Sequence, residues 1–362
     1  MKKISVSVPG RICLFGEHQD YLKLPVITAA INLRVKITGQ TNDKKLMHLH
    51  LPDIQSEEIL PILQENKFYN YELERDYFKS VANVLKRSGL NIKNGCDCTV
   101  RGNIPINSGT SSSSALNVAW VKFLIELNNE NGFQFAEKIN QIAYLAYLAE
   151  VEEFGEPGGM MDHYATAIGG VLFIDFIQPI KIKELNRNLG DFILGDSMEP
   201  KDTKEILHRV KFGVLEAVNI IKSSDPRFNL KTTKIDNLKD YDKLISSDQK
   251  DVLMGAIYNR DFTQEAKKSF EQNNFDHKKF GQLLTEHQKV LANKLKISTK
   301  KIDLMLKNAI DAGAFGGKIN GSGGGGCMFV YAPENTKKVA QAIEAAGGKA
   351  YIVKVDDGIK VH

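Results

Sequence analysis

The sequence predicts an α+β fold divided into two domains. The chain has 362 residues, which exceeds the size at which one hydrophobic core usually splits. Strand-type alternation and helix-type periodicity of apolar residues both occur in each half. The pattern weakens near residues 178–187, around Pro179, so we place a boundary there and expect domains at 1–182 and 183–362.

The first half is expected to combine strands with helices. Leu33, Val35 and Ile37 alternate with polar residues, as in a half-buried strand. The same alternation predicts strands near 3–9, 26–39, 46–51 and 96–102. Helical spacing of apolar residues predicts helices near 71–88, 113–128 and 136–153, and an apolar run predicts a strand at 171–176.

The second half is expected to be mainly helical. The spacing predicts helices near 201–222, 247–256, 277–293, 299–312 and 335–346. Apolar runs predict strands at 326–332 and 349–355. We find no internal repeat and no low-complexity tract.

Composition argues against nucleic acid and membrane partners. The net charge of +4 is small for this length, and the lysines are interspersed with acidic residues. No apolar run approaches the roughly 18 residues of a membrane-spanning helix, and no basic segment followed by an apolar one opens the chain. We therefore expect a cytoplasmic protein, a monomer or weak homodimer, with four reduced cysteines of structural role.

A serine run at the start of an expected helix is the first candidate site. In residues 105–115, Gly109 is followed by Thr110 and then by four serines, Ser111 to Ser114. Unpaired N–H groups and the positive end of the helix dipole favour an anion there, and a serine hydroxyl can add a hydrogen bond or a Mg²⁺ ligand. Serine is also a preferred cap and turn residue, so this run taken alone is better explained as an ordinary capped loop.

Two further segments favour phosphate chemistry. Residues 9–21 follow the first expected strand and place Arg11, Glu17, His18 and Asp20 between apolar residues, where unpartnered charges would be costly to bury. Residues 318–327 form a glycine-rich loop that runs into an apolar strand. Such a loop allows the backbone to approach a phosphate closely.

In this order, the three segments resemble the signature motifs of the GHMP kinases, which include galactokinase and mevalonate kinase. The first segment is most similar to galactokinase, in which Gly-Arg and Gly-Glu-His-x-Asp-Tyr match Gly10-Arg11 and residues 16–21. The resemblance implies a ribosomal-protein-like N-terminal domain with the nucleotide loop and a ferredoxin-like C-terminal domain, with the active site in the cleft between them. It also implies ATP and Mg²⁺ as cofactors.

Glu150 is the candidate metal ligand on both spacing and resemblance. It lies on the apolar stripe of the helix expected at 136–153, four residues after Ala146, whereas Glu152 and Glu153 point elsewhere. A carboxylate on such a stripe needs a cation, which spacing alone allows to be either a buried arginine or a metal. In galactokinases an Ala-Glu pair precedes the catalytic aspartate by twelve positions, and this resemblance implies that Glu150 and Ser113 bind Mg²⁺.

Asp162 and Arg11 are the catalytic candidates that the resemblance implies. Asp162 follows a glycine turn that enters a short helix, a position where aspartate is also a common cap. It matches the aspartate of the Gly-x-Met-Asp-Gln segment, the proposed base of galactokinase, with His163 in place of the glutamine. Arg11 would keep the carboxylate ionised and stabilise charge on the phosphoryl group.

The resemblance also assigns the binding residues. Glu17, His18, Asp20 and Gly159 would bind the sugar, although Glu17 and His18 could instead belong to a charged network between the domains. The expected ATP-binding residues are Pro105, Asn107, Ser108, Gly109, Thr110, Ser111, Ser112, Ser113 and Ser114. The expected phosphate loop contains Gly321, Gly323, Gly324 and Gly325.

The expected activity is ATP-dependent phosphorylation of the anomeric hydroxyl of galactose or a related aldose. Mevalonate kinases typically carry lysine in place of Arg11 and lack the aspartate of Asp20, which favours a sugar. The chain departs from galactokinase after Tyr21, where Leu22-Lys23 replaces Asn-x-Gly, and it lacks the Asn-Ser-x-Val-x-His segment. Alternatives are a non-catalytic galactokinase-like sugar sensor, a mevalonate-type kinase and, less well supported, a diphosphomevalonate decarboxylase.

Overall fold

Alternating apolar residues build a long antiparallel strand pair at the start of the chain. In the computed structural model, which describes residues 1–106, 108–128, 138–200 and 203–362, β1 (Lys3–Phe15) pairs with β2 (Val26–Asn42). The register shifts between Pro9 and Gly10 and again between Cys13 and Phe15. β1 is buried on both faces beyond Ser5, and its end delivers residues 16–21 to the interior.

The first sheet contains eight strands in the described part of the chain. Its main path runs β12-β1-β2-β5-β3-β4, and β6 pairs with β2 and β7 with β6. The pairing of β3 with β5 is parallel and the others are antiparallel. The added strands are β3 (Leu46–Leu51), β4 (Ser56–Pro61), β5 (Gly95–Gly102), β6 (Val171–Asp175), β7 (Lys181–Glu184) and β12 (Lys360–Val361).

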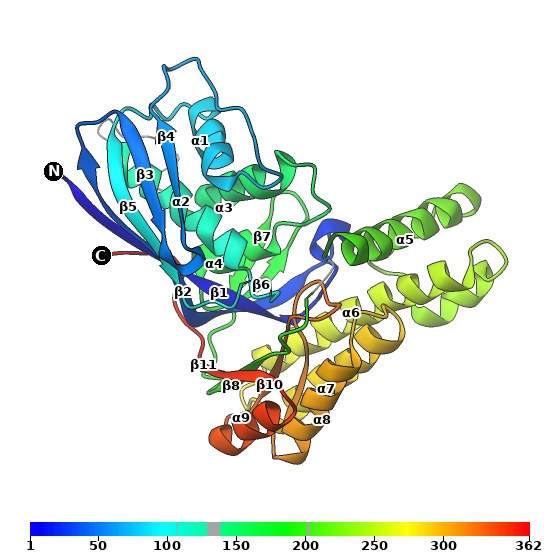
Figure 1. The fold of residues 1–362 in the computed structure, drawn as a ribbon. Helices are drawn as coiled ribbons and strands as arrows, with labels where there is room; N and C mark the ends of the chain where they lie inside the picture. Colours follow the sequence, from blue (N-terminus) through cyan, green and yellow to red (C-terminus); the bar gives the residue numbers. More distant parts are fainter. Residues whose placement is uncertain (107, 129–137, 201–202) are drawn as a thin grey trace.

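Helices cover one face of this sheet (Figure 1). α2 (Ser112–Asn128) lies against β1 and β2 and is surrounded by the other helices, so it is buried on most of its surface, Trp120 included. The others are α1 (Tyr77–Arg87), α3 (Ile139–Tyr147) and α4 (Met161–Ile168), and a π-helical segment (Leu148–Glu152) continues α3. The deep burial of α2 fixes the position of its serine-rich N-terminus.

The second half forms a smaller antiparallel sheet with the order β11-β8-β10-β9. This is the strand order of a ferredoxin-like βαββαβ unit, with extra helices between its first two strands. The strands are β8 (Phe192–Asp196), β9 (Gly316–Ile319), β10 (Cys327–Tyr331) and β11 (Lys349–Val353). The helices are α5 (Thr203–Ser224), α6 (Ser247–Glu271), α7 (His277–Asn293), α8 (Lys300–Asp311) and α9 (Thr336–Ala345).

The structure confirms the predicted α+β fold and most of its elements. The helix predicted at 247–256 ends too early, because α6 continues to Glu271 with Asn259, Arg260 and Thr263 on its buried face. β4, β7, β8, β9 and β12 were not predicted. The helices expected at 136–153 and 201–222 begin at Ile139 and Thr203, and residues 136–137 and 201–202 lie outside the described part.

Both ends of the chain lie beside the first sheet (Figure 1). β12 pairs with β1, so the last residues return from the second sheet to the first, and β7 extends the first sheet to Glu184. The predicted boundary between residues 182 and 183 falls within β7 and stays a prediction. The four cysteines are buried, and none of them forms a disulfide in the part of the chain that the structure describes. In the described ranges, no helix has both the length and the apolar character needed to cross a membrane.

Candidate functional site

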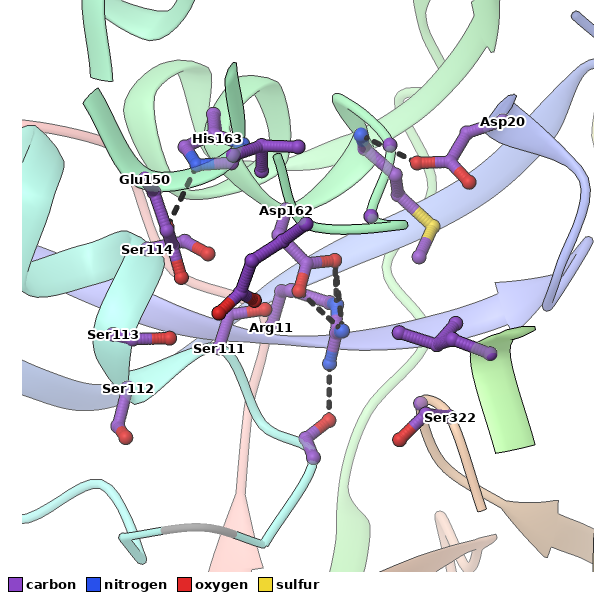
Figure 2. Close-up of a pocket in the computed structure, with 18 of the residues that line it drawn as sticks. Arg11, Asp20, Ser111, Ser112, Ser113, Ser114, Glu150, Asp162, His163 and Ser322 are labelled. Atoms are coloured by element: carbon purple, nitrogen blue, oxygen red, sulfur yellow. Dashed lines mark hydrogen bonds and ion pairs between the residues drawn. The ribbon is translucent and has the colours of Figure 1, made fainter. Parts of the chain in front are cut away.

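A pocket of about 180 Å³ lies where the end of β1, the N-termini of α2 and α4, and the loop after β9 meet. Most of the residues singled out from the sequence line it (Figure 2). These are Arg11, Glu17, His18, Asp20, Ser108, Gly109, Ser111, Ser112, Ser113, Ser114, Glu150, Gly159, Asp162 and Gly321. Pro105, Thr110, Gly323, Gly324 and Gly325 do not line it, and Asn107 is outside the described residues.

Arg11 and Asp162 form a bidentate ion pair at the centre of the pocket (Figure 2). Arg11 Nε donates to Asp162 Oδ1 at 2.9 Å and Nη2 donates to Oδ2 at 2.8 Å. Burial raises the pKa of the Asp162 carboxyl, but the charge and hydrogen bonds of Arg11, together with a hydrogen bond from Ser111 and the nearby His163, outweigh burial and hold this pKa below its usual value. Asp162 is therefore an ionised carboxylate at neutral pH, and 28% of its side chain stays exposed to the pocket.

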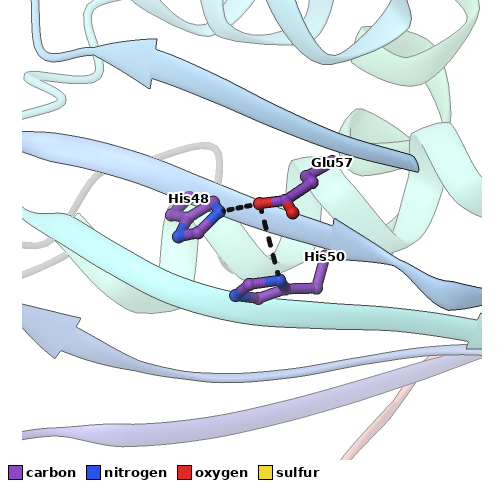
Figure 3. A group of neighbouring side chains, drawn as sticks. All are labelled: His48, His50 and Glu57. Carbon is purple, nitrogen blue, oxygen red and sulfur yellow. Dashed lines mark hydrogen bonds and ion pairs between the residues drawn. The ribbon is translucent and has the colours of Figure 1, made fainter. Parts of the chain in front are cut away.

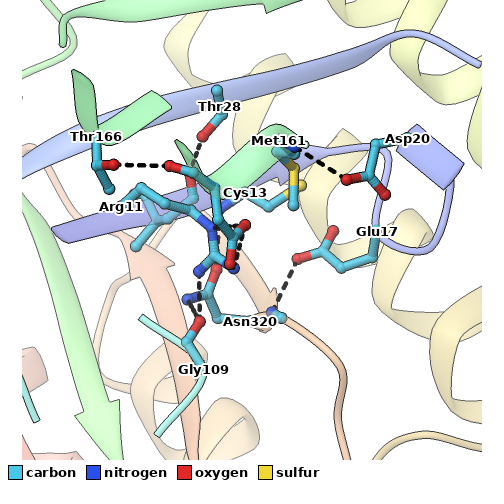
Figure 4. Close-up of polar contacts among 12 residues, drawn as sticks. Arg11, Cys13, Glu17, Asp20, Thr28, Gly109, Met161, Thr166 and Asn320 are labelled. Atoms are coloured by element: carbon cyan, nitrogen blue, oxygen red, sulfur yellow. Dashed lines mark hydrogen bonds and ion pairs between the residues drawn. The ribbon is translucent and has the colours of Figure 1, made fainter. Parts of the chain in front are cut away.

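Arg11 also ties the ion pair to the serine loop. Its Nη1 donates to the carbonyl oxygen of Gly109, and its backbone N–H donates to the carbonyl oxygen of Thr110 at 3.1 Å (Figure 4). Gly10 allows this close approach, because a Cβ there would lie 2.9 Å from the Thr110 carbonyl oxygen. The strand end and the loop that precedes α2 are thus held as one unit.

Asp20 is fixed by backbone donors and by the absence of a side chain on Gly159. The Met161 N–H donates to Asp20 Oδ2 at 3.0 Å, and the Tyr21 N–H donates to Oδ1 at 2.9 Å (Figure 4). A Cβ on Gly159 would overlap the Asp20 carboxyl group. Burial, together with the nearby charge of Asp162, raises the pKa of Asp20 above its usual value.

Glu17 forms a buried ion pair that joins the two halves of the chain. Its Oε1 lies 2.5 Å from Lys318 Nζ on β9 and accepts from the Gly321 N–H at 3.3 Å. Lys318 also donates to the carbonyl oxygens of Cys13 and Ile319, so its buried ammonium group has three oxygen partners. Glu17 Oε2 is buried and has no hydrogen-bond partner among the described residues.

The loop that carries Glu17 and His18 rests on the polar face of α6. Asn259 Nδ2 donates to the Glu17 carbonyl oxygen at 3.1 Å, and Gln19 Nε2 donates to the Ala256 carbonyl oxygen at 3.2 Å. The imidazole of His18 lies 2.8 Å from the Tyr21 hydroxyl through Nδ1 and 3.0 Å from the Ser322 carbonyl oxygen through Nε2. His18 itself has a positive φ of 60°.

The serine run occupies the N-terminus of α2 as expected. Ser112 begins the helix, and Ser111 has a left-handed backbone with a φ of 62°. The Ser111 hydroxyl is buried, lines the pocket and hydrogen-bonds with the Asp162 carboxylate, which helps to lower the pKa of that carboxyl. The helix N-terminus fits an anionic ligand, because the first-turn N–H groups lack partners within the helix.

The glycine-rich loop packs against the serine loop, but only part of it reaches the pocket. Gly321 lies so close to Gly109 that a Cβ would be 2.8 Å from its carbonyl oxygen, and the Asn320 side chain donates to the same oxygen at 2.8 Å (Figure 4). The other three expected phosphate-loop glycines face other parts of the C-terminal half. A Cβ would meet Ile297 at Gly323, Ile206 at Gly324, and the backbone of residues 199–200 at Gly325.

Glu150 faces the serines from the π-helical segment (Figure 2). It is buried whereas Glu152 is exposed, as the apolar stripe predicted. Glu150 Oε2 lies 2.7 Å from Nε2 of buried His163, and His163 Nδ1 has no hydrogen-bond partner among the described residues. A carboxylate and hydroxyl oxygens are the hard donors that Mg²⁺ prefers, so this donor set fits the expected metal.

Several pocket residues were not singled out from the sequence. Arg75 and Tyr77 line the pocket, and Arg75 Nε donates to Glu156 Oε1 at 2.7 Å. Lys318 is the first residue of the glycine-rich segment 318–327, and the sequence analysis assigned it no role. The sequence feature that could have identified it is a lysine among glycine and apolar residues, because a lysine buried in such a strand needs a carboxylate partner.

Comparison with protein families gives three matches along the chain. The model for the GHMP kinases N terminal domain matches residues 76–170, and that for the GHMP kinases C terminal matches residues 266–352. The galactokinase galactose-binding signature matches residues 2–41. The chain belongs to the GHMP kinase family. Its members use ATP, and the protein is therefore a kinase of the sugar or mevalonate type.

Relatives of this GHMP kinase include both substrate classes. It is 28% identical to a mevalonate kinase from Thermococcus onnurineus, over 99% of this chain and 98% of that kinase. It is 26% identical to a galactokinase from Pyrococcus furiosus over the full length of both. The crystal structure of Lactococcus lactis galactokinase complexed with galactose shares the fold, with a TM-score of 0.85 at 23% identity over 99% of this chain and 95% of that one.

Proposed function

We propose that this GHMP kinase transfers the γ-phosphoryl group of ATP to the anomeric hydroxyl of a free aldose, with galactose as the leading substrate. The observation that carries the proposal is the position of Asp20, held by two backbone N–H groups beside the Arg11–Asp162 pair. Both Arg11 and Asp20 fall within the match to the galactose-binding signature. A fixed carboxylate next to a candidate base suits recognition of a polyol.

In the proposed reaction, Asp162 accepts the proton of the sugar hydroxyl. The hydroxyl oxygen forms a bond to the γ-phosphorus while the bond to the β,γ-bridging oxygen breaks, so sugar 1-phosphate and ADP result. Arg11 keeps Asp162 ionised and supplies positive charge next to the transferred group. The N–H groups of the first turn of α2 supply donors to phosphate oxygens, and Ser111 lies beside them at the pocket wall.

Glu150 and Ser113 are the proposed ligands of Mg²⁺, which when bound would neutralise charge on the phosphates. His163, bonded to Glu150 Oε2, would orient this carboxylate and leave its other oxygen for the metal. In this arrangement His163 is a positioning residue, and Asp162 remains the base because it is ionised at neutral pH and exposed to the pocket.

Mevalonate is the second candidate substrate, because curated mevalonate kinases are 27–29% identical to this chain over nearly its full length. Arg11 and Asp20 favour the sugar, since galactokinases resemble the chain at both positions.

A coupled ADP-release assay with galactose, other aldoses, N-acetylated hexosamines, uronic acids and mevalonate distinguishes the sugar from mevalonate as substrate. We expect turnover of a sugar and, by phosphorus NMR, a phosphate on carbon one. A 6-phosphate product, or turnover of mevalonate alone, would refute the proposal, and binding of sugar without turnover would favour the sensor alternative.

A further inference from the structure

Two histidines and a glutamate meet on the outer face of the first sheet, away from the pocket (Figure 3). In β3, Met47 and Leu49 are buried, so His48 and His50 point to the opposite, solvent-facing side. Glu57 on β4 is the direct cross-strand partner of His50. The three side chains therefore share one face of the edge strand pair.

Both imidazoles approach the same carboxylate oxygen. His48 Nε2 lies 2.6 Å from Glu57 Oε2, and His50 Nδ1 lies 4.0 Å from that oxygen. The two rings are 4.1 Å apart between centroids, and one potential ligand atom from each of the three residues lies within 4.8 Å of the others. A surface hydrogen bond would need only one imidazole, and the second ring therefore points to a shared ligand.

A fourth side chain is placed to orient His48. Its Nδ1 lies 3.8 Å from Oδ1 of Asp97 on β5, the strand parallel to β3, and Asp97 is the residue in register with His48. Asp97 is itself held by Asn42, whose Nδ2 donates to Oδ2 at 3.1 Å. A carboxylate behind the far nitrogen of a histidine is the usual outer partner of a metal-binding imidazole.

We propose that His48, His50 and Glu57 bind a zinc ion. Two imidazole nitrogens and one carboxylate oxygen suit Zn²⁺, which binds such ligands at about 2.0–2.2 Å and completes a tetrahedral shell with water. Tetrahedral ligand atoms at that radius are about 3.3 Å apart, a spacing that rotation of the exposed His50 and Glu57 side chains can reach from the present one. Magnesium prefers oxygen ligands and would instead bind to the Glu150 and Ser113 side chains in the pocket.

The site would cross-link the edge of the sheet. β4 ends the main strand path and pairs with β3 alone among the strands described. A zinc ion shared by His50 and Glu57 would join these two strands through side chains in addition to their backbone hydrogen bonds. Binding only to the folded chain would then raise the melting temperature with zinc concentration.

Titration of the metal-free, full-length protein with zinc chloride tests the proposal. We expect one high-affinity site by calorimetry outside the catalytic pocket, and a tetrahedral absorption spectrum when cobalt is used in place of zinc. His50→Ala and Glu57→Gln should each weaken zinc binding by roughly tenfold or more, since loss of an outer-shell partner alone commonly costs that much. Both side chains are exposed, so circular dichroism should show an unchanged fold.

The matched control is His208→Ala, which removes an exposed histidine on α5 that lies beside Phe212. This variant should bind zinc like the wild type and keep the zinc-dependent rise in melting temperature, whereas His50→Ala should lose that rise. The proposal is overturned if no zinc binds, if His50→Ala and Glu57→Gln bind zinc as tightly as the wild type, or if His208→Ala is weakened equally. It is also overturned if Glu150→Gln alone abolishes binding.

Discussion

Replacing Gly159 with alanine should selectively weaken sugar binding. A Cβ built on Gly159 would lie 2.0 Å from Oδ2 of Asp20, whereas real Cβ atoms keep at least about 3.0 Å from their neighbours. The Asp20 carboxylate, or the turn that carries residue 159, must therefore move by about 1 Å. That movement breaks the hydrogen bond from the Met161 N–H, which is 3.0 Å long in the native arrangement.

The size of the effect follows from that one hydrogen bond. Leaving a buried donor or acceptor without its partner costs about 1–3 kcal/mol. If Asp20 contacts the sugar, the same displacement removes the sugar hydroxyl from its acceptor, and affinity should fall by roughly 5- to 150-fold. The Michaelis constant for Mg-ATP should change little, because neither Asp20 nor Gly159 belongs to the serine loop.

The adjacent glycine supplies a matched control. A Cβ on Gly158 would lie 3.4 and 3.8 Å from the methyl groups of Val151, which is ordinary van der Waals contact. Calorimetric sugar titration and steady-state kinetics with galactose should therefore show wild-type behaviour for Gly158→Ala and a weakened sugar constant for Gly159→Ala. Equal sugar affinity in both variants, with intact melting temperatures, would refute the assignment of Asp20 as a sugar ligand.

Three further predictions concern the charged groups of the interior. Asp162→Asn should lower turnover on the order of 100- to 10,000-fold, because the amide keeps the shape of the side chain and loses its basicity. Calorimetry should still detect binding of sugar and nucleotide, and wild-type turnover would mean that Asp162 serves only as a helix cap. Glu150→Gln and Ser113→Ala should each raise the magnesium concentration needed for half-maximal activity by roughly tenfold, whereas Glu152→Gln should not, and equal effects in a magnesium titration would contradict the buried-stripe argument. Burial, together with a nearby lysine charge, holds the pKa of His287 well below 6.5, so as the pH falls below 6.5 the unfolded chain binds a proton before the folded chain does, and the free energy of unfolding decreases by up to about 1.4 kcal/mol per pH unit. In chemical unfolding curves measured at several pH values, His287→Phe should make the free energy of unfolding fall less steeply below pH 6.5. An unchanged slope would contradict this role of His287.

Apolar periodicity predicted the helices whose buried face is apolar. The helix expected at 277–293 matches α7, where Phe280, Leu284 and Leu291 recur on the buried side and the Asp276 side chain accepts from the Lys279 N–H at the first turn. The burial of Glu150 followed from the same rule. These elements were readable because local spacing and tertiary burial agree.

The same rule failed where the buried face is polar. Beyond residue 256, α6 buries Asn259, Arg260 and Thr263, which contact Glu17, Leu230 and Gln19 far away in the sequence, so polar residues interrupt the apolar pattern although the helix continues. β4 was missed for a related reason. It is an edge strand with mostly exposed residues, and only Leu60 is buried. Polar contacts between distant segments leave no periodic signal in one sequence.

The motifs identified which residues gather at the pocket but not which neighbours hold them. Ten residues of segments 9–21 and 105–115 that line the pocket were nominated from the sequence, as were Glu150, Gly159, Asp162 and Gly321, whereas the support of the Glu17 loop by α6 could not be. The glycine-rich loop shows that the motif alone did not predict which of its residues reach the pocket. Its glycines look equivalent in the sequence, but Gly321 lines the pocket and Gly323 faces Ile297, because the loop turns away after Ser322.

Glu17 shows that a sugar ligand and a bridge between the domains are compatible roles for one carboxylate. Its Oε1 is committed to Lys318 and to the Gly321 N–H, which fixes the side chain between β1 and β9. Its Oε2 is buried, belongs to a residue lining the pocket, and has no hydrogen-bond partner among the described residues. A buried acceptor without a donor is unfavourable by about 1–3 kcal/mol, and a hydroxyl group of the proposed sugar would remove that cost. Lys318 and Gly321 of the second domain would then hold Glu17 in place, while the sugar hydroxyl would donate the missing hydrogen bond to its Oε2. Sugar affinity should therefore depend on this contact between the two halves of the chain as well as on the residues that face the sugar.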